Sequence, residues 1–119
     1  MSPVSELIRV SRRAGIVQVD LLTPMLIGDN AIERMADEIA VIIDAETNPR
    51  IVLNFARVKF ISSTMLGTLI ALYNRVQARG GQFRLAALGE RHRHLLALVH
   101  LDSVFEVHAT PEQAAASFK

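Results

Sequence analysis

Three consecutive hydroxyl side chains, Ser62, Ser63 and Thr64, are the residues of this sequence best placed for chemistry. They follow a strand-like segment and open a segment with helical periodicity, and sites in open α/β sheets gather where strands end. A phosphate on such a hydroxyl would lie at the positive end of a helix dipole and add about −1.5 to −2 charges at neutral pH. The alternative is structural, because one hydroxyl at this position commonly caps a helix, and spacing alone favours that interpretation.

Enzymatic use of Ser63 would need more than its hydroxyl. A serine nucleophile requires an activating base and a third group that orients the base, and no residue of this sequence can be assigned either role. Neither a G-x-S-x-G elbow nor a phosphate-binding or dinucleotide-binding glycine motif is present. We therefore expect a binding module that is not an enzyme and needs no cofactor.

The histidines and arginines of residues 91–94 suggest a metal or nucleic-acid site only at first sight. His92 and His94 are two residues apart, so on a helix their side chains point about 200° apart. The sequence has no cysteine to assist a metal, and the basic residues have no neighbouring aromatic residues for nucleic-acid binding. The segment is predicted to be a solvated first turn of a helix, with no metal and no nucleic acid bound.

Length and composition favour one soluble domain spanning residues 1–119. The formal net charge is +1, which gives no whole-chain attraction to nucleic acid or anionic membranes. No apolar run approaches the roughly 20 residues that cross a bilayer, and no secretory signal is visible. We expect a cytoplasmic protein without direct membrane insertion.

The elements that must position the hydroxyl residues alternate along the chain. Apolar spacing predicts two hairpin strands, then alternating helices and strands, then a final helix capped by Thr110. The strands are expected at residues 6–11, 16–21, 51–56, 82–88 and 104–107, and the helices around residues 32–43, 66–76, 90–100 and after Pro111. This order predicts an α/β fold, with a mostly parallel mixed sheet of four to five strands and packed helices.

Finer expectations follow from the same spacing. Asp29 or Asn30 is predicted to cap the first helix. Ile70 is expected to face the core from the second helix, and Leu98 and Val99 are expected to be buried to some degree on the third.

Part of the sequence resembles the STAS domain, the fold of anti-sigma-factor antagonists. The resemblance covers more than half of the chain in order, and its most specific part is the segment Phe60-Ile61-Ser62-Ser63-Thr64-Met65-Leu66-Gly67. Weaker support comes from residues 51–55, 79–85 and 101–105 and from Val58. The resemblance implies a single STAS-like domain.

Carried over by position, the resemblance makes Ser63 the serine that an anti-sigma serine kinase phosphorylates. The family's loop aspartate falls on Ser62, its strand aspartate on Asn54 and its loop glycine on Met65. A kinase that recognises the aspartate is expected to recognise this loop less well. Met65 is expected to serve as an apolar partner contact. The expected partner-binding residues are Asp29, Ser62, Ser63, Thr64, Met65 and Gly67.

The resemblance implies a bacterial anti-sigma-factor antagonist in a partner-switching circuit that controls transcription. Its partners would be an anti-sigma-factor serine kinase and a cognate phosphatase. The alternative is a STAS scaffold subunit, without phosphorylation, in a signalling or transporter complex. The sequence leaves self-association of the domain open.

Overall fold

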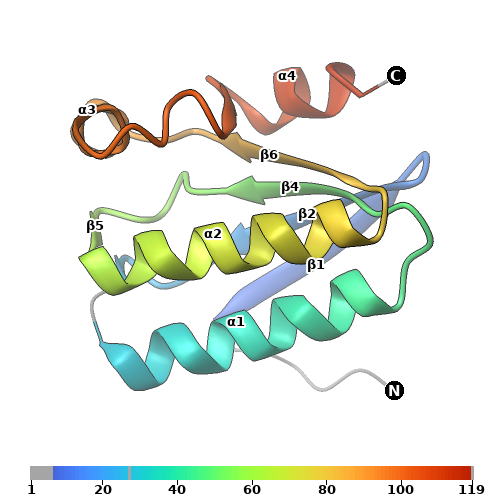
Figure 1. Ribbon diagram of the computed structural model, residues 1–119, viewed down its shortest axis with the longest axis horizontal. Coiled ribbons are helices and arrows are strands. Elements are labelled where there is room, and N and C mark those ends of the chain that lie inside the picture. Colours follow the sequence, from blue (N-terminus) through green and yellow to red (C-terminus); the bar gives the residue numbers. More distant parts are fainter. Residues whose placement is uncertain (1–6, 27, 119) are drawn as a thin grey trace.

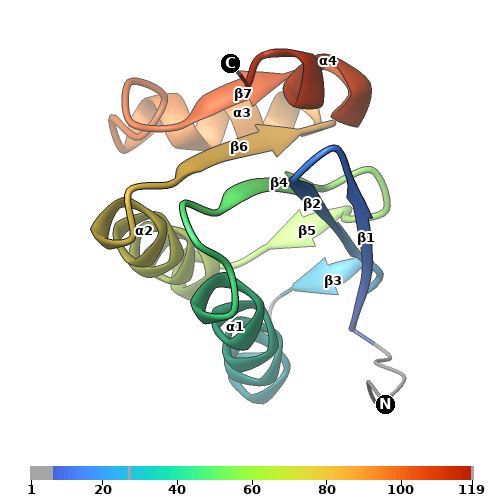
Figure 2. The same ribbon diagram turned by 90° about the vertical axis from the view of Figure 1, so that its right-hand side faces the viewer.

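A five-stranded mixed sheet lies at the centre of the computed structural model, which describes residues 7–26 and 28–118 (Figures 1 and 2). The strand order is β1-β2-β4-β6-β7; β1 pairs with β2 antiparallel, and the other neighbours pair in parallel. The strands span β1 Ile8–Arg13, β2 Ile16–Leu21, β4 Arg50–Asn54, β6 Gln82–Ala86 and β7 Glu106–His108. The predicted α/β fold with a mostly parallel mixed sheet is confirmed.

The predicted hairpin at the start of the sheet has a two-residue turn. Arg13 pairs with Ile16, and the intervening Ala14 and Gly15 have φ values of 53° and 79°. Positive φ at both central residues matches the turn type whose twist fits two paired strands. The alternation in β2 then places Val17 and other apolar residues on one face of the sheet and Gln18 and other polar residues on the opposite face.

Two long helices, α1 (Asp29–Asp44) and α2 (Ser63–Ala78), cover the apolar face of the sheet. Figure 2 shows both helices on the same side of the sheet. Their buried side chains recur at helical spacing and meet the inward side chains of the strands in one core. The buried residues of α1 are Ile32, Met35, Ile39 and Ile43.

A salt bridge joins the two long helices near their C-terminal ends. Arg75 Nε donates a hydrogen bond to Asp44 Oδ1 at 2.9 Å, and this bond holds the pKa of Asp44 below its ordinary value. Both side chains are exposed, so solvent screens the pair and its contribution to folding is small.

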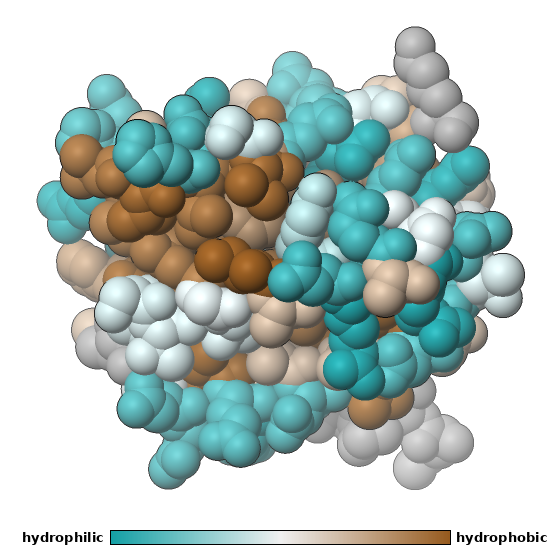
Figure 3. All heavy atoms as spheres, in the orientation of Figure 1, coloured by the Kyte–Doolittle hydropathy of each residue, from teal (hydrophilic) through white to brown (hydrophobic). Residues whose placement is uncertain are grey.

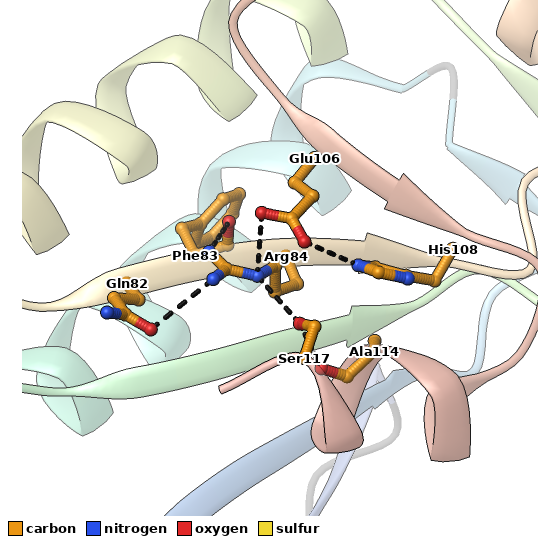
Figure 4. A network of polar contacts seen from close by, with 7 residues as sticks. All are labelled: Gln82, Phe83, Arg84, Glu106, His108, Ala114 and Ser117. Carbon is orange, nitrogen blue, oxygen red and sulfur yellow. Dashed lines mark hydrogen bonds and ion pairs between the residues drawn. The ribbon is translucent and has the colours of Figure 1, made fainter. Parts of the chain in front are cut away.

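The opposite face of the sheet is covered in part by α4 (Pro111–Ala116), which packs on β4, β6 and β7. Thr110 caps this helix as predicted, since its hydroxyl accepts a hydrogen bond from Gln113 N at 3.1 Å. Arg84 fixes the end of the helix by donating to Ser117 Oγ at 2.9 Å (Figure 4). Its guanidinium also lies 4.7 Å from the centre of the Phe118 ring. Glu106 completes the network, with Oε2 3.1 Å from Arg84 Nε.

Helix α3 (Glu90–Leu98) lies between β6 and β7 in sequence, and the side chains that it buries differ from the predicted ones. His92 is 4% exposed, so the prediction of a fully solvated first turn is wrong at this residue. His92 and Leu96 are four residues apart, and together they form the buried side of the helix. Because that side faces inward, Leu98 and Val99 are 64% and 45% exposed, and their predicted burial is wrong.

A second, two-stranded sheet was absent from the prediction. It consists of β3 (Met25–Leu26) and β5 (Phe60–Ile61), which pair in parallel. Lys59 N and Phe60 N both donate to Pro24 O, at 2.7 Å and 3.1 Å. This short pair joins the segment before α1 to the segment before α2, and it sets where the two helices begin.

Candidate functional site

The turn that leaves the central strand β4 is fixed by the side chain of Asn54. Its Oδ1 accepts a hydrogen bond from Ala56 N at 3.1 Å, and its Nδ2 donates to Asp20 Oδ1 at 2.9 Å. The first contact closes a local turn and the second ties that turn to β2. Asn54, where the resemblance implies an aspartate, therefore has a structural role in this chain.

The segment that follows this turn is anchored on a second side by α3. His92 Nε2 lies 3.1 Å from Lys59 O, and its ring is buried. A carbonyl oxygen can only accept, so His92 donates from Nε2 and carries its proton there in the neutral form. Together with the bonds to Pro24 O, this contact holds the backbone at residues 59–61 just before the hydroxyl residues.

Helix α2 then begins without a side-chain cap. Ser62 is the N-cap residue, with φ −95° and ψ 169°, but its hydroxyl makes no capping hydrogen bond. Ser62 Oγ is buried and has no hydrogen-bond partner, so the interpretation of Ser62 as a side-chain cap is wrong. Met65 N donates to Ser62 O at 3.0 Å, whereas the N–H groups of Ser63 and Thr64 have no partner among the described residues and are left for water or for an added anion.

The predicted site residues on α2 separate into an exposed and a buried group. Ser63, Thr64 and Gly67 are exposed. Met65 is 0% exposed, and the prediction that it contacts a partner is wrong. It begins the buried stripe of the helix, which continues at Leu69 and Leu72 with the spacing of one helical face.

Asp29 is brought to the same end of the molecule as Ser63. Helix α1 follows β3 and helix α2 follows β5, and because β3 and β5 are parallel the two helices begin side by side (Figure 1). Asp29 is exposed and is the first residue of α1. The N-cap is Gly28, not Asp29 or Asn30, so that prediction is wrong by one or two residues.

The site includes two apolar side chains that sequence reasoning missed. Met25 and Phe60 are direct neighbours across the β3–β5 pair and are 49% and 45% exposed. Phe60 could have been recognised from the sequence as a site residue, because its aromatic ring comes two residues before the first hydroxyl. The pairing of Met25 with Phe60 could not, because the two strands are too short to show periodicity.

Exposed basic residues precede Phe60 in the chain, and one more lies against its ring. Arg57 and Lys59 are exposed in the segment between β4 and β5, and the Arg91 guanidinium lies 6.0 Å from the centre of the Phe60 ring. The arrangement offers hydroxyls, apolar surface and positive charge on one side of the molecule, which suits contact with another protein.

Chemistry at Ser63 has no visible assistance from neighbouring side chains. No hydrogen bond joins Ser63 to a histidine or carboxylate in the described part of the chain, and the contacts of the His92 and His108 rings are to Lys59 O and Glu106. Over residues 7–26 and 28–118, no group of three histidine or acidic side chains is arranged to hold a metal ion.

Among the helices of residues 7–26 and 28–118, none combines the length and the hydropathy that a bilayer span requires.

Gly67 offers a test of the exposed side of α2. A Cβ at this position would meet no heavy atom within 4 Å, and the residue lies inside a helix. Gly67→Ala is therefore expected to raise the free energy of unfolding by about 1 kcal/mol, because alanine loses less backbone entropy in a helix. Urea denaturation checks this value, and a loss of stability would show that the position is crowded.

Comparisons with known proteins give the same fold. A family model described as STAS domain matches residues 8–114. A solved anti-sigma-factor antagonist (STAS) domain protein from Planctomyces limnophilus has a TM-score of 0.81 and 17% identity, over 92% of this chain and 96% of that one.

Two other solved structures with the same fold have different descriptions. SpoIIAA, a Bacillus cell-fate determinant in its phosphorylated form, has a TM-score of 0.70 and 22% identity, over 92% of this chain and 96% of that one. A sulfate transporter family protein from Wolinella succinogenes has a TM-score of 0.70 and 17% identity, over 87% of this chain and 84% of that one. The family model covers nearly all of the described residues, and the chain belongs to the STAS domain family.

Proposed function

We propose that this protein is an anti-sigma-factor antagonist that binds a partner protein and is switched by phosphorylation of Ser63. The partner would be an anti-sigma-factor serine kinase, and a phosphatase would restore the unphosphorylated form. The observation that carries the proposal is the position of Ser63, exposed in the first turn of a helix whose N-cap residue, Ser62, makes no side-chain capping hydrogen bond.

Local electrostatics support a phosphate at this position. The N–H groups of Ser63 and Thr64 and the positive end of the α2 dipole both stabilise an added anion. The exposed basic residues Arg57 and Lys59 lie in the preceding segment. Ser62 is a poorer acceptor of phosphate because its hydroxyl is buried, whereas Thr64 is exposed and needs a control.

The surroundings of Ser63 also support a loss of binding after phosphorylation. Met25 and Phe60 add exposed apolar surface beside the helix start, and a partner docked there would exclude water from the hydroxyl. A phosphate in such an interface would lose hydration and repel acidic groups of the partner. The unphosphorylated form is therefore the binding form in this proposal.

A binding role is favoured over catalysis by Ser63. The hydroxyl has no hydrogen bond to a base in the described residues, and nucleophilic serines depend on such a base. ATP and the kinase would be met in the cytoplasm, so the proposal places the protein there.

A second candidate function is a STAS scaffold subunit that is never phosphorylated. It is favoured by Ser62, which replaces the acidic residue that the resemblance implies before the phosphorylated serine. The similarity to a sulfate transporter family structure also fits a role in a larger assembly.

Phosphorylation by an anti-sigma-factor serine kinase from the same organism separates the two candidates. The protein is incubated with that kinase and ATP, and its intact mass is measured. We expect the mass of one phosphate on the wild type and on Thr64→Ala, and no addition on Ser63→Ala. An unmodified wild-type protein, with the kinase active on a control substrate, would support the scaffold.

A further inference from the structure

An exposed apolar surface lies on α2, on the end of α3 and on the segment that follows α3. Its members are Ile70, Leu98, Val99 and Val104, which are 37%, 64%, 45% and 39% exposed. Figure 3 shows hydrophobic residues gathered over this part of the molecule, toward the upper left of the view. We call these four residues the α2–α3 surface.

The two parts of this surface are joined by an aromatic contact beneath it. The rings of Tyr73 on α2 and Phe105 lie edge to face, with centroids 5.6 Å apart. Ile70 precedes Tyr73 by three residues and so lies on the same side of α2, and Val104 is the neighbour of Phe105. The surface therefore belongs to one packed region.

The charges around α3 oppose its own dipole. Arg91 and Arg93 lie in the first turn, where acidic residues are favoured, and Asp102 follows the C-terminal end, where basic residues are favoured. All three side chains are exposed, and Glu90 is the acidic residue of the first turn. This arrangement costs some helix stability within one copy, but it leaves a positive and a negative group at opposite ends of the same helix.

We propose that the α2–α3 surface binds a second copy of this chain in a two-fold symmetric dimer, with the two α3 helices antiparallel. Arg91 of one copy then approaches Asp102 of the other, and symmetry repeats the contact. A parallel arrangement would oppose like charges and is disfavoured. Arg91, Leu95 and Leu98 are spaced along one side of α3, so the charged and apolar contacts can form together.

Sedimentation velocity at protein concentrations from about 1 μM to about 1 mM detects dimers with dissociation constants in the same range. The wild type is expected to shift from monomer to dimer with concentration. Leu98→Asp is expected to raise the dissociation constant at least about a hundredfold, because symmetry buries two carboxylates against apolar side chains. Val41→Asp is the matched control, since Val41 is 70% exposed on α1, outside the surface, and it should leave the dimer intact.

A charge exchange tests the orientation of the two helices. Arg91→Glu and Asp102→Lys are each expected to weaken the dimer, and the double variant is expected to restore it because each new lysine faces a new glutamate. Circular dichroism and the thermal midpoint confirm that every variant is folded. A wild type that stays monomeric, a dimer that Leu98→Asp leaves unchanged, or a folded double variant without recovery would overturn the proposal.

Discussion

Ser63→Asp is expected to weaken binding to the proposed partner kinase about a hundredfold, which corresponds to a loss of about 3 kcal/mol. The aspartate adds a negative charge at the exposed start of α2, where the proposed interface covers the hydroxyl. The helix itself tolerates an acidic residue in its first turn, so the loss arises in the complex and not in the folded domain. Isothermal titration calorimetry of the variant and the wild type against the kinase measures the difference.

Two controls separate the effect of charge from that of the lost hydroxyl. Ser63→Ala should bind as the wild type does, because no hydrogen bond of Ser63 is lost from the described structure. Val41→Asp adds the same charge on α1 away from the site and should also bind normally. If Ser63→Asp and Ser63→Ala both retain full affinity, the switch proposal fails even though the fold assignment stands.

Gly81→Ala is expected to reduce the free energy of unfolding by about 3 kcal/mol, because it overpacks a tight chain crossing. A Cβ on Gly81 would lie 2.2 Å from Pro49 O and 2.8 Å from two ring carbons of Pro49. Pro49 is buried, and its carbonyl also accepts a hydrogen bond from Gln82 N at 2.8 Å. The added methyl group must therefore displace backbone where β4 and β6 begin their pairing.

The helix end next to Gly81 explains why this crossing is so close. Gly80 N donates to Gln77 O and Gly81 N donates to Val76 O, both at 3.0 Å, and Gly80 has a φ of 71°. These bonds form the Schellman end of α2, in which the left-handed residue turns the chain directly into β6. Urea denaturation of Gly81→Ala beside Gly67→Ala provides a matched pair, since the second glycine has open space. Equal stability of the two variants would contradict the crossing described for Pro49.

Strong periodicity made most of the fold predictable. The buried residues of α1 recur at helical intervals, and the alternation in β2 follows the two faces of the sheet. Thr110-Pro111 marked the start of α4 because both residues have local backbone reasons for their positions. The exposed position of Ser63 also agrees with its expected place at the start of a helix.

Features that depend on packing between distant segments were not predictable. The β3–β5 pair has two residues in each strand, which is too few for a periodic pattern. Met65 occupies the family's loop glycine position and was therefore predicted to contact a partner. Its burial depends on how α2 packs on the sheet, which the local sequence does not show. His92 was predicted to be solvated because its neighbours in sequence are charged. Its buried ring instead bonds the carbonyl of Lys59, which is 33 residues away.

The parallel start of α1 and α2 has a consequence for the speed of recognition. The two helix dipoles point the same way, so their positive ends add at the end of the molecule that carries Ser63, with Asp29 offsetting part of the field. An acidic surface is attracted to this end over roughly one Debye length, about 8 Å at physiological ionic strength. A dianion at Ser63 would reverse that attraction, so it would slow the encounter with such a surface as well as shorten the life of the complex.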